Sequence, residues 1–418
     1  MKNKSILRAI GEVKDDYVKE AIPHKNITQK RHWINGGVLV ACLILAVLAI
    51  IKVSHTNPLE PAHDLGDLPM LTIAEDRGGS MGFEGYMAYD ISEIVNNNPW
   101  TENTKISTLP VYQNLLVYDD NYQVLGADID KMKEFLLDVA SRLGMDADNL
   151  EITDNTLDEK TEADILEKLE LEGNEPEGYF SPSAVIAEDN GIKIEVSQQM
   201  TAAITFDPAV TLPDEYNFTY FSPYEQVAAA AEYLKEEYAG LIRMDNPQIN
   251  IHGGDYALFS GEKEEIYGSQ QAQGYSIEFY EGSGDITSEI INYNFNGVAF
   301  FSCDDGKLDG ASVSQTDLSS KVGDYPIIPV SEAKQLLKNG NYITTVLEEM
   351  PKLEYSAKVE LIYRTDATEQ YFMPYYRFYV ELPNIQRGNG LKTYGAYYVP
   401  AVKGEYISNM PIWDDGFN

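Results

Sequence analysis

The sequence predicts an α+β protein with a single N-terminal transmembrane helix followed by an ectodomain of helix-plus-antiparallel-meander units. Two observations carry this prediction. An uncharged apolar run fills residues 33–51, and beyond it helical apolar periodicity gives way three times to alternating, strand-like segments. Hydrophobic residues make up 44% and charged residues 23% of the chain, which is typical of a folded protein and not of a disordered one.

Residues 1–32 are expected to form a cytoplasmic tail. Its apolar residues recur at helical spacing with charges between them: Ile6, Ile10, Val13 and Tyr17. Pro23 ends this pattern. The apolar stripe is either an amphipathic helix on the inner leaflet or a docking surface for a cytoplasmic or membrane regulatory protein. The four residues are therefore the candidate docking site in the cytoplasm.

Residues 33–52 are expected to be the membrane span. As a helix, the uncharged run reaches ~28 Å at ~1.5 Å per residue, close to the thickness of a bilayer core. Several lysines and arginines precede it, whereas no lysine or arginine follows Lys52 until Arg77. The positive-inside rule places the N-terminus in the cytoplasm and the rest of the chain outside. A cleaved signal peptide is the disfavoured alternative, because the segment before the apolar run is long and residues 52–55 make a poor cleavage site.

Residues 53–105 are rich in proline and glycine over their first half and are expected to be a spacer and an entry segment to the ectodomain. The α+β ectodomain is expected over residues 106–322, as two helix-plus-sheet units, and a C-terminal α+β unit over residues 323–418. Helical periodicity marks a helix over 130–143 that Gly144 terminates.

Two further helices are expected from their end signals. A capping box at 222–225 begins the second, and Gly240 ends it. Ser331 caps the third, and Gly340 stops it.

The strand predictions rest on period-two alternation of apolar side chains. Such segments occur at 192–196, 276–279, 359–363 and 376–382. Asn296-Gly297 stands between two apolar segments and predicts a tight β-hairpin turn. Residues 145–177 carry 13 acids and two lysines and are expected to be a solvated surface excursion.

Charge is distributed unevenly and excludes one class of partner. The net charge is −36, yet residues 1–52 hold nine basic residues against four acids, which leaves 22 basic and 63 acidic residues in the remainder. So acidic a surface repels nucleic acid, and no nucleic-acid partner is expected. Cys42 and Cys303 are the two cysteines, and with one inside the apolar run they give no disulfide framework.

No catalytic, cofactor-binding or metal site is predicted. Gly78–Gly82 matches a nucleophile elbow but falls in the spacer, and Ser331–Lys334 matches a serine–lysine pair without its companion motifs. The five histidines form no cluster for zinc, and the acidic stretch 304–310 lacks the ligand order of a calcium loop.

Tyrosine is the unusual enrichment, with 29 residues. A cluster in the terminal strands is the candidate interaction surface: Tyr375, Tyr379, Tyr394 and Tyr398. An amphipathic ring with few rotatable bonds suits recognition. Cross-strand packing in an antiparallel sheet is the competing interpretation, and it is the more favoured of the two.

Several segments carry a resemblance. The tail ILRAIGEVKDDYVKEA followed by WINGGVLVACLILAV resembles the N-terminus of uncharacterised single-pass membrane proteins of Gram-positive bacteria, some of which look like membrane-bound sigma-factor regulators. The segments GFEGYMAYDIS, YFMPYYRFYVEL and LKTYGAYYVPAV are similar to parts of such proteins. The architecture is more loosely similar to extracytoplasmic regulators of a cell-wall-sensing histidine kinase. Neither resemblance supplies functional residues.

These observations favour a non-enzymatic, membrane-anchored envelope protein with a sensing, binding or regulatory role. The alternative is a membrane-anchored envelope hydrolase that acts on cell-wall material, and a scaffold for other envelope proteins is a third interpretation. No cofactor is expected in any of them.

Overall fold

The computed structural model describes residues 68–74, 87–88, 96–118, 124–169, 173–219, 222–252, 256–259, 266–267, 275–302, 306–344, 346, 350–365, 369–384, 392 and 394–413. The chain divides into two compact units, Met1–Asp64 and Leu65–Asn418, and every described residue belongs to the second. The expected tail, with Ile6, Ile10, Val13 and Tyr17, and the expected span at 33–52 lie outside the described residues. Within the described part, no helix has the length and apolar character needed to cross a membrane.

The α+β class is confirmed, because helices accompany sheets whose ladders between named strands are all antiparallel. The described α-helices are α4 (Ile129–Arg142), α5 (Glu159–Leu169), α6 (Tyr224–Glu237), α7 (Ala239–Ile242), α8 (Ile286–Phe295) and α9 (Val330–Lys338). Short 3-10 turns occur at Asp214–Tyr216, Leu353–Tyr355 and Gly404–Tyr406.

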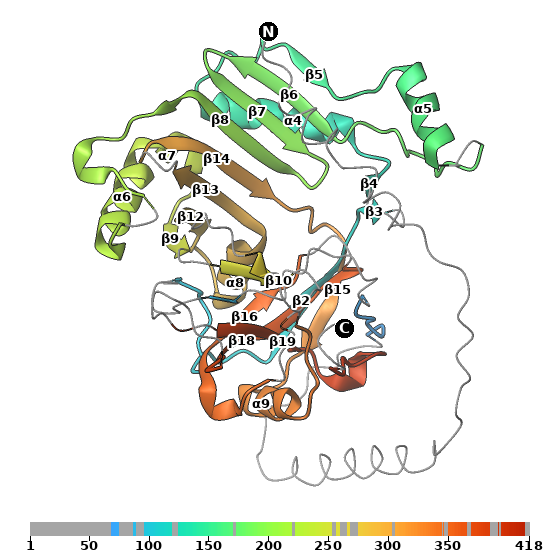
Figure 1. The fold of residues 1–418 in the computed structure, drawn as a ribbon, viewed down its shortest axis with the longest axis vertical. Coiled ribbons are helices and arrows are strands. Elements are labelled where there is room, and N and C mark those ends of the chain that lie inside the picture. The colour runs from blue at the N-terminus through green and yellow to red at the C-terminus, as the bar shows by residue number, and fades with distance from the viewer. Residues whose placement is uncertain are drawn as a thin grey trace. The chain divides into compact units, whose positions relative to one another are not determined.

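The largest sheet has eight strands in the order β5-β6-β7-β8-β14-β13-β12-β9. Their bounds are β5 Ile152–Asp154, β6 Ala184–Asp189, β7 Ile192–Ser197, β8 Thr201–Val210, β14 Leu308–Gln315, β13 Asn296–Ser302, β12 Ser276–Glu281 and β9 Pro247–His252. Two runs build it, each a helix followed by four sheet strands: α4 with β5 to β8, and α6 with β9, β12, β13 and β14. The runs join where β8 pairs with β14 (Figure 1).

One face of this sheet forms a hydrophobic core with α4, α6 and α7. The strands alternate, so Ile204 and Phe206 are buried while Ala203 and Thr205 are exposed on the opposite face. In α4, the expected stripe Met132, Phe135, Leu136 and Val139 is buried, Asp128 caps the N-terminus, and Gly144 follows the C-cap with φ +75°. Helices α4, α6 and α7 therefore all cover the same face.

The remaining strands form three smaller sheets. A six-stranded sheet has the order β11-β10-β1-β19-β18-β16, a three-stranded one the order β15-β2-β17, and β3 pairs with β4. Their bounds are β11 Ile266–Tyr267, β10 Tyr256–Phe259, β1 Met87–Ala88, β19 Tyr394–Pro400, β18 Pro374–Glu381, β16 Ser356–Tyr363, β15 Lys321–Pro326, β2 Thr108–Gln113, β17 Tyr371–Phe372, β3 Val117–Tyr118 and β4 Val124–Leu125. The boundary expected between residues 322 and 323 falls inside β15.

Strands β16, β18 and β19 are buried on both faces, and every residue of β19 is buried. One face packs with α8 and α9 through residues that include Phe295, Leu337 and Phe378. The other face packs with residues near both ends of the unit, among them Leu71 and Ile407. The Leu71 N–H donates to the Tyr406 carbonyl at 2.8 Å, so residues 68–74, which the sequence placed in the spacer, belong to the fold and pack with its C-terminal end.

Some local predictions were wrong. Residues 286–295 are helix α8, capped by Asp285, and Asn296-Gly297 begins β13 instead of turning a hairpin. Helix α6 begins at Tyr224 without a side-chain cap, because the Ser222 hydroxyl accepts the Thr219 N–H instead. That helix ends at Glu237, before the expected Gly240, which lies inside α7.

For the third expected helix, the predicted N-terminal cap was wrong and the predicted C-terminal stop was confirmed. Ser331 lies inside α9, whose N-cap is Pro329, so the serine is not the cap. The stop at Gly340 is confirmed, with φ +83° just past the helix.

The assigned core predicts that two helical leucines contribute very differently to the free energy of unfolding. Leu136 in α4 is fully buried, whereas Leu169 in α5 is 48% exposed. Leu136→Ala is expected to lower the free energy of unfolding by ~2–5 kcal/mol, because it removes buried methyl groups and leaves a cavity. Leu169→Ala should stay within ~0.5 kcal/mol of wild type. Urea denaturation of both variants tests this, and equal losses would contradict the assigned core.

Candidate functional site

A cavity of about 680 Å³ lies between the face of the eight-stranded sheet opposite α4, α6 and α7 and the strands that lead into the six-stranded sheet. Its volume falls in the range of small-molecule sites, ~300–1,000 Å³. The floor comes from β8, β12, β13 and β14, whose lining side chains include Thr201, Glu278, Tyr280, Ala299, Phe301, Ser312 and Ser314. The opposite wall comes from β16, its following residues, β18 and β19, with Ile362, Arg364, Thr365, Arg377 and Tyr398.

The floor follows directly from strand alternation. In β12 to β14, Phe279, Phe300 and Val313 enter the core under the helices, so their sequence neighbours face the other way. Those neighbours are acidic, small or hydroxylated, for example Glu278, Ala299 and Ser312. A sheet with helices on one face thus presents a polar second face to the cavity.

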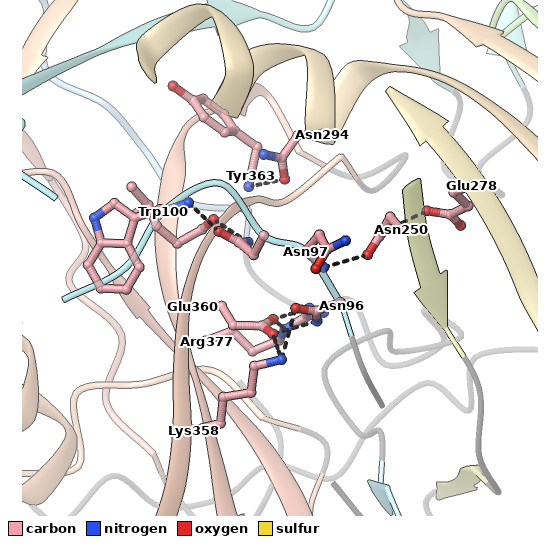
Figure 2. A network of polar contacts seen from close by, with 12 residues as sticks. Asn96, Asn97, Trp100, Asn250, Glu278, Asn294, Lys358, Glu360, Tyr363 and Arg377 are labelled. Atoms are coloured by element: carbon pink, nitrogen blue, oxygen red, sulfur yellow. Dashed lines mark hydrogen bonds and ion pairs between the residues drawn. The ribbon is translucent and has the colours of Figure 1, made fainter. Parts of the chain in front are cut away.

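Residues 96–100 cross between two sheet edges next to this cavity (Figure 2). Three consecutive asparagines each serve a different partner. Asn96 donates to the Glu360 carboxylate, the Asn97 N–H donates to Asn250 Oδ1 at 3.0 Å, and Asn98 donates to the Leu361 carbonyl at 3.1 Å. Because β9 and β16 are the edge strands of their sheets, this segment supplies partners to both edges.

Further contacts fix the same segment. The Tyr280 hydroxyl donates to the Asn97 carbonyl at 2.8 Å. Trp100 is buried, with its ring centroid 5.4 Å from that of Tyr376. Asn294, near the end of α8, accepts the Tyr363 N–H at 2.9 Å. Residues 96–98 and helix α8 are therefore both joined to β16 by side-chain hydrogen bonds.

A buried ionic cluster lies at the wall. Glu360 is 1% exposed and lies opposite Arg377 across the strand pair, with Lys358 Nζ 2.6 Å from its carboxylate. Burial alone would raise the pKa of the Glu360 carboxyl, but the charges of Arg377 and Lys358, with their hydrogen bonds, lower this pKa to about 2. Glu360 is therefore ionised, and Arg377 is held against both it and the Tyr379 ring, 5.2 Å from the ring centroid.

Tyr293 brings a hydroxyl to the cavity from α8. The oxygen is buried, and the Asn250 side chain is close enough to hydrogen-bond with it. Burial, followed by the negative charge of Glu360, raises the pKa of this hydroxyl above its usual range. The group is thus a neutral donor and acceptor near a cavity, and such a buried group normally finds a partner.

A second buried ion pair supports the wall. Arg364 Nη1 lies 2.8 Å from Glu369 Oε1, and both side chains are at most 9% exposed. The Arg364 guanidinium also lies over the Tyr375 ring, 5.3 Å from its centroid. These contacts hold Arg364 at the cavity with its charge already compensated.

The four tyrosines expected to form an interaction surface are instead buried. Tyr375, Tyr379, Tyr394 and Tyr398 are 0–5% exposed and belong to one core cluster. This corrects the surface interpretation, because residues 68–74 and 402–410 supply apolar side chains that cover the face of the sheet on which the tyrosines stand. Tyr398 also lines the cavity.

Among the described residues, the other motifs considered as catalytic or metal sites have no neighbouring groups that would support such chemistry. The nucleophile-like stretch at 78–82 and residues 304–305 of the acidic stretch at 304–310 lie outside the described residues, and Leu308–Gly310 of that stretch belong to β14. Ser331 lies in the first turn of α9, and Lys334 pairs with Glu102 at 3.2 Å. Within the described part of the chain, no group of three histidine, cysteine or acidic residues is placed to hold a metal ion.

Sequence reasoning missed the site residues themselves. The run Asn-Asn-Asn-Pro-Trp at 96–100 was assigned to the spacer, although three amides before a proline and a tryptophan are unusual in a solvated linker. Glu360 was also missed. Its position between Val359 and Leu361, in a strand flanked by apolar residues on both sides, was the available indication that it is buried.

The ionic cluster predicts a pH-dependent stability. The pKa of Glu360 is lower in the fold than the usual 4.5, so its contribution is complete above pH ~4.5 and is lost as the pH falls towards ~2. Glu360→Gln is expected to lower the free energy of unfolding at pH 7 by up to ~3–5 kcal/mol, because it leaves two half-buried cations without their carboxylate. The gap between wild type and variant should then narrow as the pH falls through this window.

Urea denaturation at a series of pH values measures both effects. Glu354→Gln is the matched control, because that side chain is 67% exposed, and it should stay within ~0.5 kcal/mol of wild type. A gap between wild type and Glu360→Gln that is constant with pH would contradict the assigned ionisation.

Comparison with known proteins adds little. No family model matches the chain, and no curated protein matches it. Among solved structures, the chain is similar to an uncharacterised protein from Eubacterium rectale, whose crystal structure was determined at 1.45 Å resolution. The identity is 12%, the match covers 72% of this chain and 85% of that chain, and the TM-score is 0.31. A likeness at this level carries no argument about function.

Proposed function

We propose that the chain is a non-enzymatic envelope protein that binds a small ligand in the cavity beside residues 96–100. The observation that carries this proposal is the cavity itself, about 680 Å³ with both polar and apolar lining residues and the buried Tyr293 hydroxyl at its wall. Binding needs a preformed concave site with a few placed polar groups, and the two buried ion pairs hold such groups in position.

The proposal includes the membrane topology. Residues 33–52 form a single transmembrane helix, residues 1–32 lie in the cytoplasm, and the remainder is extracytoplasmic. The apolar run and the basic residues before it support this topology. The ectodomain carries helix-plus-meander units that are copies of one plan, which the two similar runs of the eight-stranded sheet support.

A sensing role follows from how the chain connects these parts. Residues 71–73 pair with the C-terminal end. The Ser408 N–H donates to the Leu71 carbonyl at 2.8 Å, and the Asn409 side chain accepts the Ile73 N–H and donates to the Ile73 carbonyl. A change in the unit upon binding would thus act on the chain close to the membrane. The stripe Ile6, Ile10, Val13 and Tyr17 would then contact a cytoplasmic or membrane regulatory protein.

Protease protection tests the topology. The full-length protein carries different epitopes at its two ends, and protoplasts are treated with protease from outside. We expect the C-terminal epitope to be lost while an N-terminal fragment of tail and helix stays protected, because the bilayer shields it. The N-terminal epitope should be digested only after detergent lysis. Its digestion in intact protoplasts would contradict the proposed orientation.

Blocking the cavity tests the binding role. The full-length protein in detergent is screened by thermal shift against neutral sugars, sugar acids, amino acids and short peptides. At least one compound is expected to raise Tm saturably, since a ligand that binds the folded state stabilises it. Ala299→Trp should abolish this shift, because the indole fills the cavity floor.

Thr205→Trp is the matched control. Thr205 is exposed on the same sheet face as Ala299 but does not line the cavity, so the shift should persist in this variant. If no compound shifts Tm, or if Ala299→Trp responds like wild type, the binding proposal is wrong.

A further inference from the structure

We infer that the ligand of this cavity is a neutral, polyhydroxylated chain, an uncharged oligosaccharide segment. This inference rests on the proposed binding function and adds the chemical class of the ligand. Four properties of the cavity carry it: balanced charge, uncommitted hydroxyl and amide groups, an exposed aromatic ring, and a floor made of inner strands.

Charge at the cavity cancels although the chain as a whole is strongly acidic. Arg377 and Lys358 surround Glu360, and Arg364 pairs with Glu369. With Glu278, the lining residues and their direct partners therefore hold three acids and three bases. Because each cation already faces a carboxylate, an anionic ligand would find no spare positive charge, and a cationic ligand would have to compete with the resident cations.

The polar groups that remain are donors and acceptors at once. Thr201 and Ser314 face each other across β8 and β14 at 3.5 Å, and Ser312 stands one pleat away on the same face, roughly 7 Å along the strand. The Ser312 hydroxyl makes no hydrogen bond with a described residue, and Gln199 brings an exposed amide to the rim. Sugar hydroxyls also donate and accept, so they match such groups without any charge.

An apolar platform lies beside these groups. Phe301 is 43% exposed on β13, on the same face as Gly297 and Ala299, whose small side chains leave its surroundings open. The C–H face of a sugar ring packs well on an aromatic face, which carries partial negative charge. The Tyr293 hydroxyl then offers a buried polar contact deeper in the cavity.

The strands of the floor argue against an extended peptide as the ligand. Strands β12, β13, β14 and β8 are all interior to the sheet order, so their backbone groups already pair with neighbouring strands. A peptide that binds by strand addition needs a free edge. Only side chains are available on this face, which favours a ligand that is recognised through side-chain hydroxyls, amides and rings.

Isothermal titration calorimetry of the full-length protein in detergent tests the ligand class. The probes are tetramers of glucose, mannose and N-acetylglucosamine, with a tetramer of galacturonic acid as the charged counterpart and tetra-alanine as the peptide. At least one neutral tetramer is expected to bind saturably, with little change in affinity when salt is raised, because no charge pairing is involved. The galacturonate tetramer and the peptide should bind at least about tenfold more weakly.

Substitutions show where the ligand binds and how much each lining residue contributes to the affinity. Ala299→Trp should abolish binding of the neutral tetramer, Phe301→Ala should weaken it by about tenfold, and Ser312→Ala by a smaller factor, while Thr205→Trp leaves it unchanged. Tm of each unliganded variant is measured alongside, so that loss of folding is distinguished from loss of affinity.

The outcomes divide cleanly. In one outcome, galacturonate or the peptide binds, Ala299→Trp abolishes that binding, and no neutral tetramer binds. This outcome would overturn the proposed ligand class and leave the binding function standing. No binding that depends on Ala299 would overturn both. Release of shorter sugars from a bound tetramer would favour the hydrolase alternative and contradict a purely binding role.

Discussion

The arrangement of the sheets depends on the hydrogen bonds that residues 96–100 make to the edge strands of two sheets. Asn96 and Asn98 bond to β16 and its neighbours, and Asn97 bonds to β9, so one short segment satisfies backbone and side-chain groups of both edges. Glu360 lies at the centre of this arrangement and is ionised although it is buried. A carboxylate in that position is tolerated only with cations and donors around it, which fixes where Lys358 and Arg377 must stand.

This constraint also accounts for the cavity. Buried polar networks specify one arrangement of the elements, because a shifted register would leave charges and amides without partners. Two apolar sheet faces would pack directly against each other and leave no cavity between them. Here the facing surfaces carry Glu278, Ser312, Arg364 and Arg377, which are held by local bonds or left open, and a volume of about 680 Å³ remains between them.

The tyrosine-rich terminal strands illustrate how the same residues take on a different role in three dimensions. Their alternation indicated a sheet, and that sheet exists as β16, β18 and β19. Its exposure could not be predicted, because the covering side chains come from residues 68–74 and 402–410, near the two ends of the unit. The face that would have been available for a partner is therefore part of the core.

Local patterns in the sequence determined the α+β class, helix α4 with its stop at Gly144, and the alternating strands, because propensity and periodicity act over a few neighbouring residues. The hairpin expected at Asn296-Gly297 failed because the helix formed by 286–295 takes precedence over a two-residue turn preference. The cavity was decided by tertiary structure alone. Its residues, such as Thr201, Glu278, Ser312 and Arg377, lie far apart in the chain, and the order of strands that brings them together is set by long-range packing and by the bonds of residues 96–100.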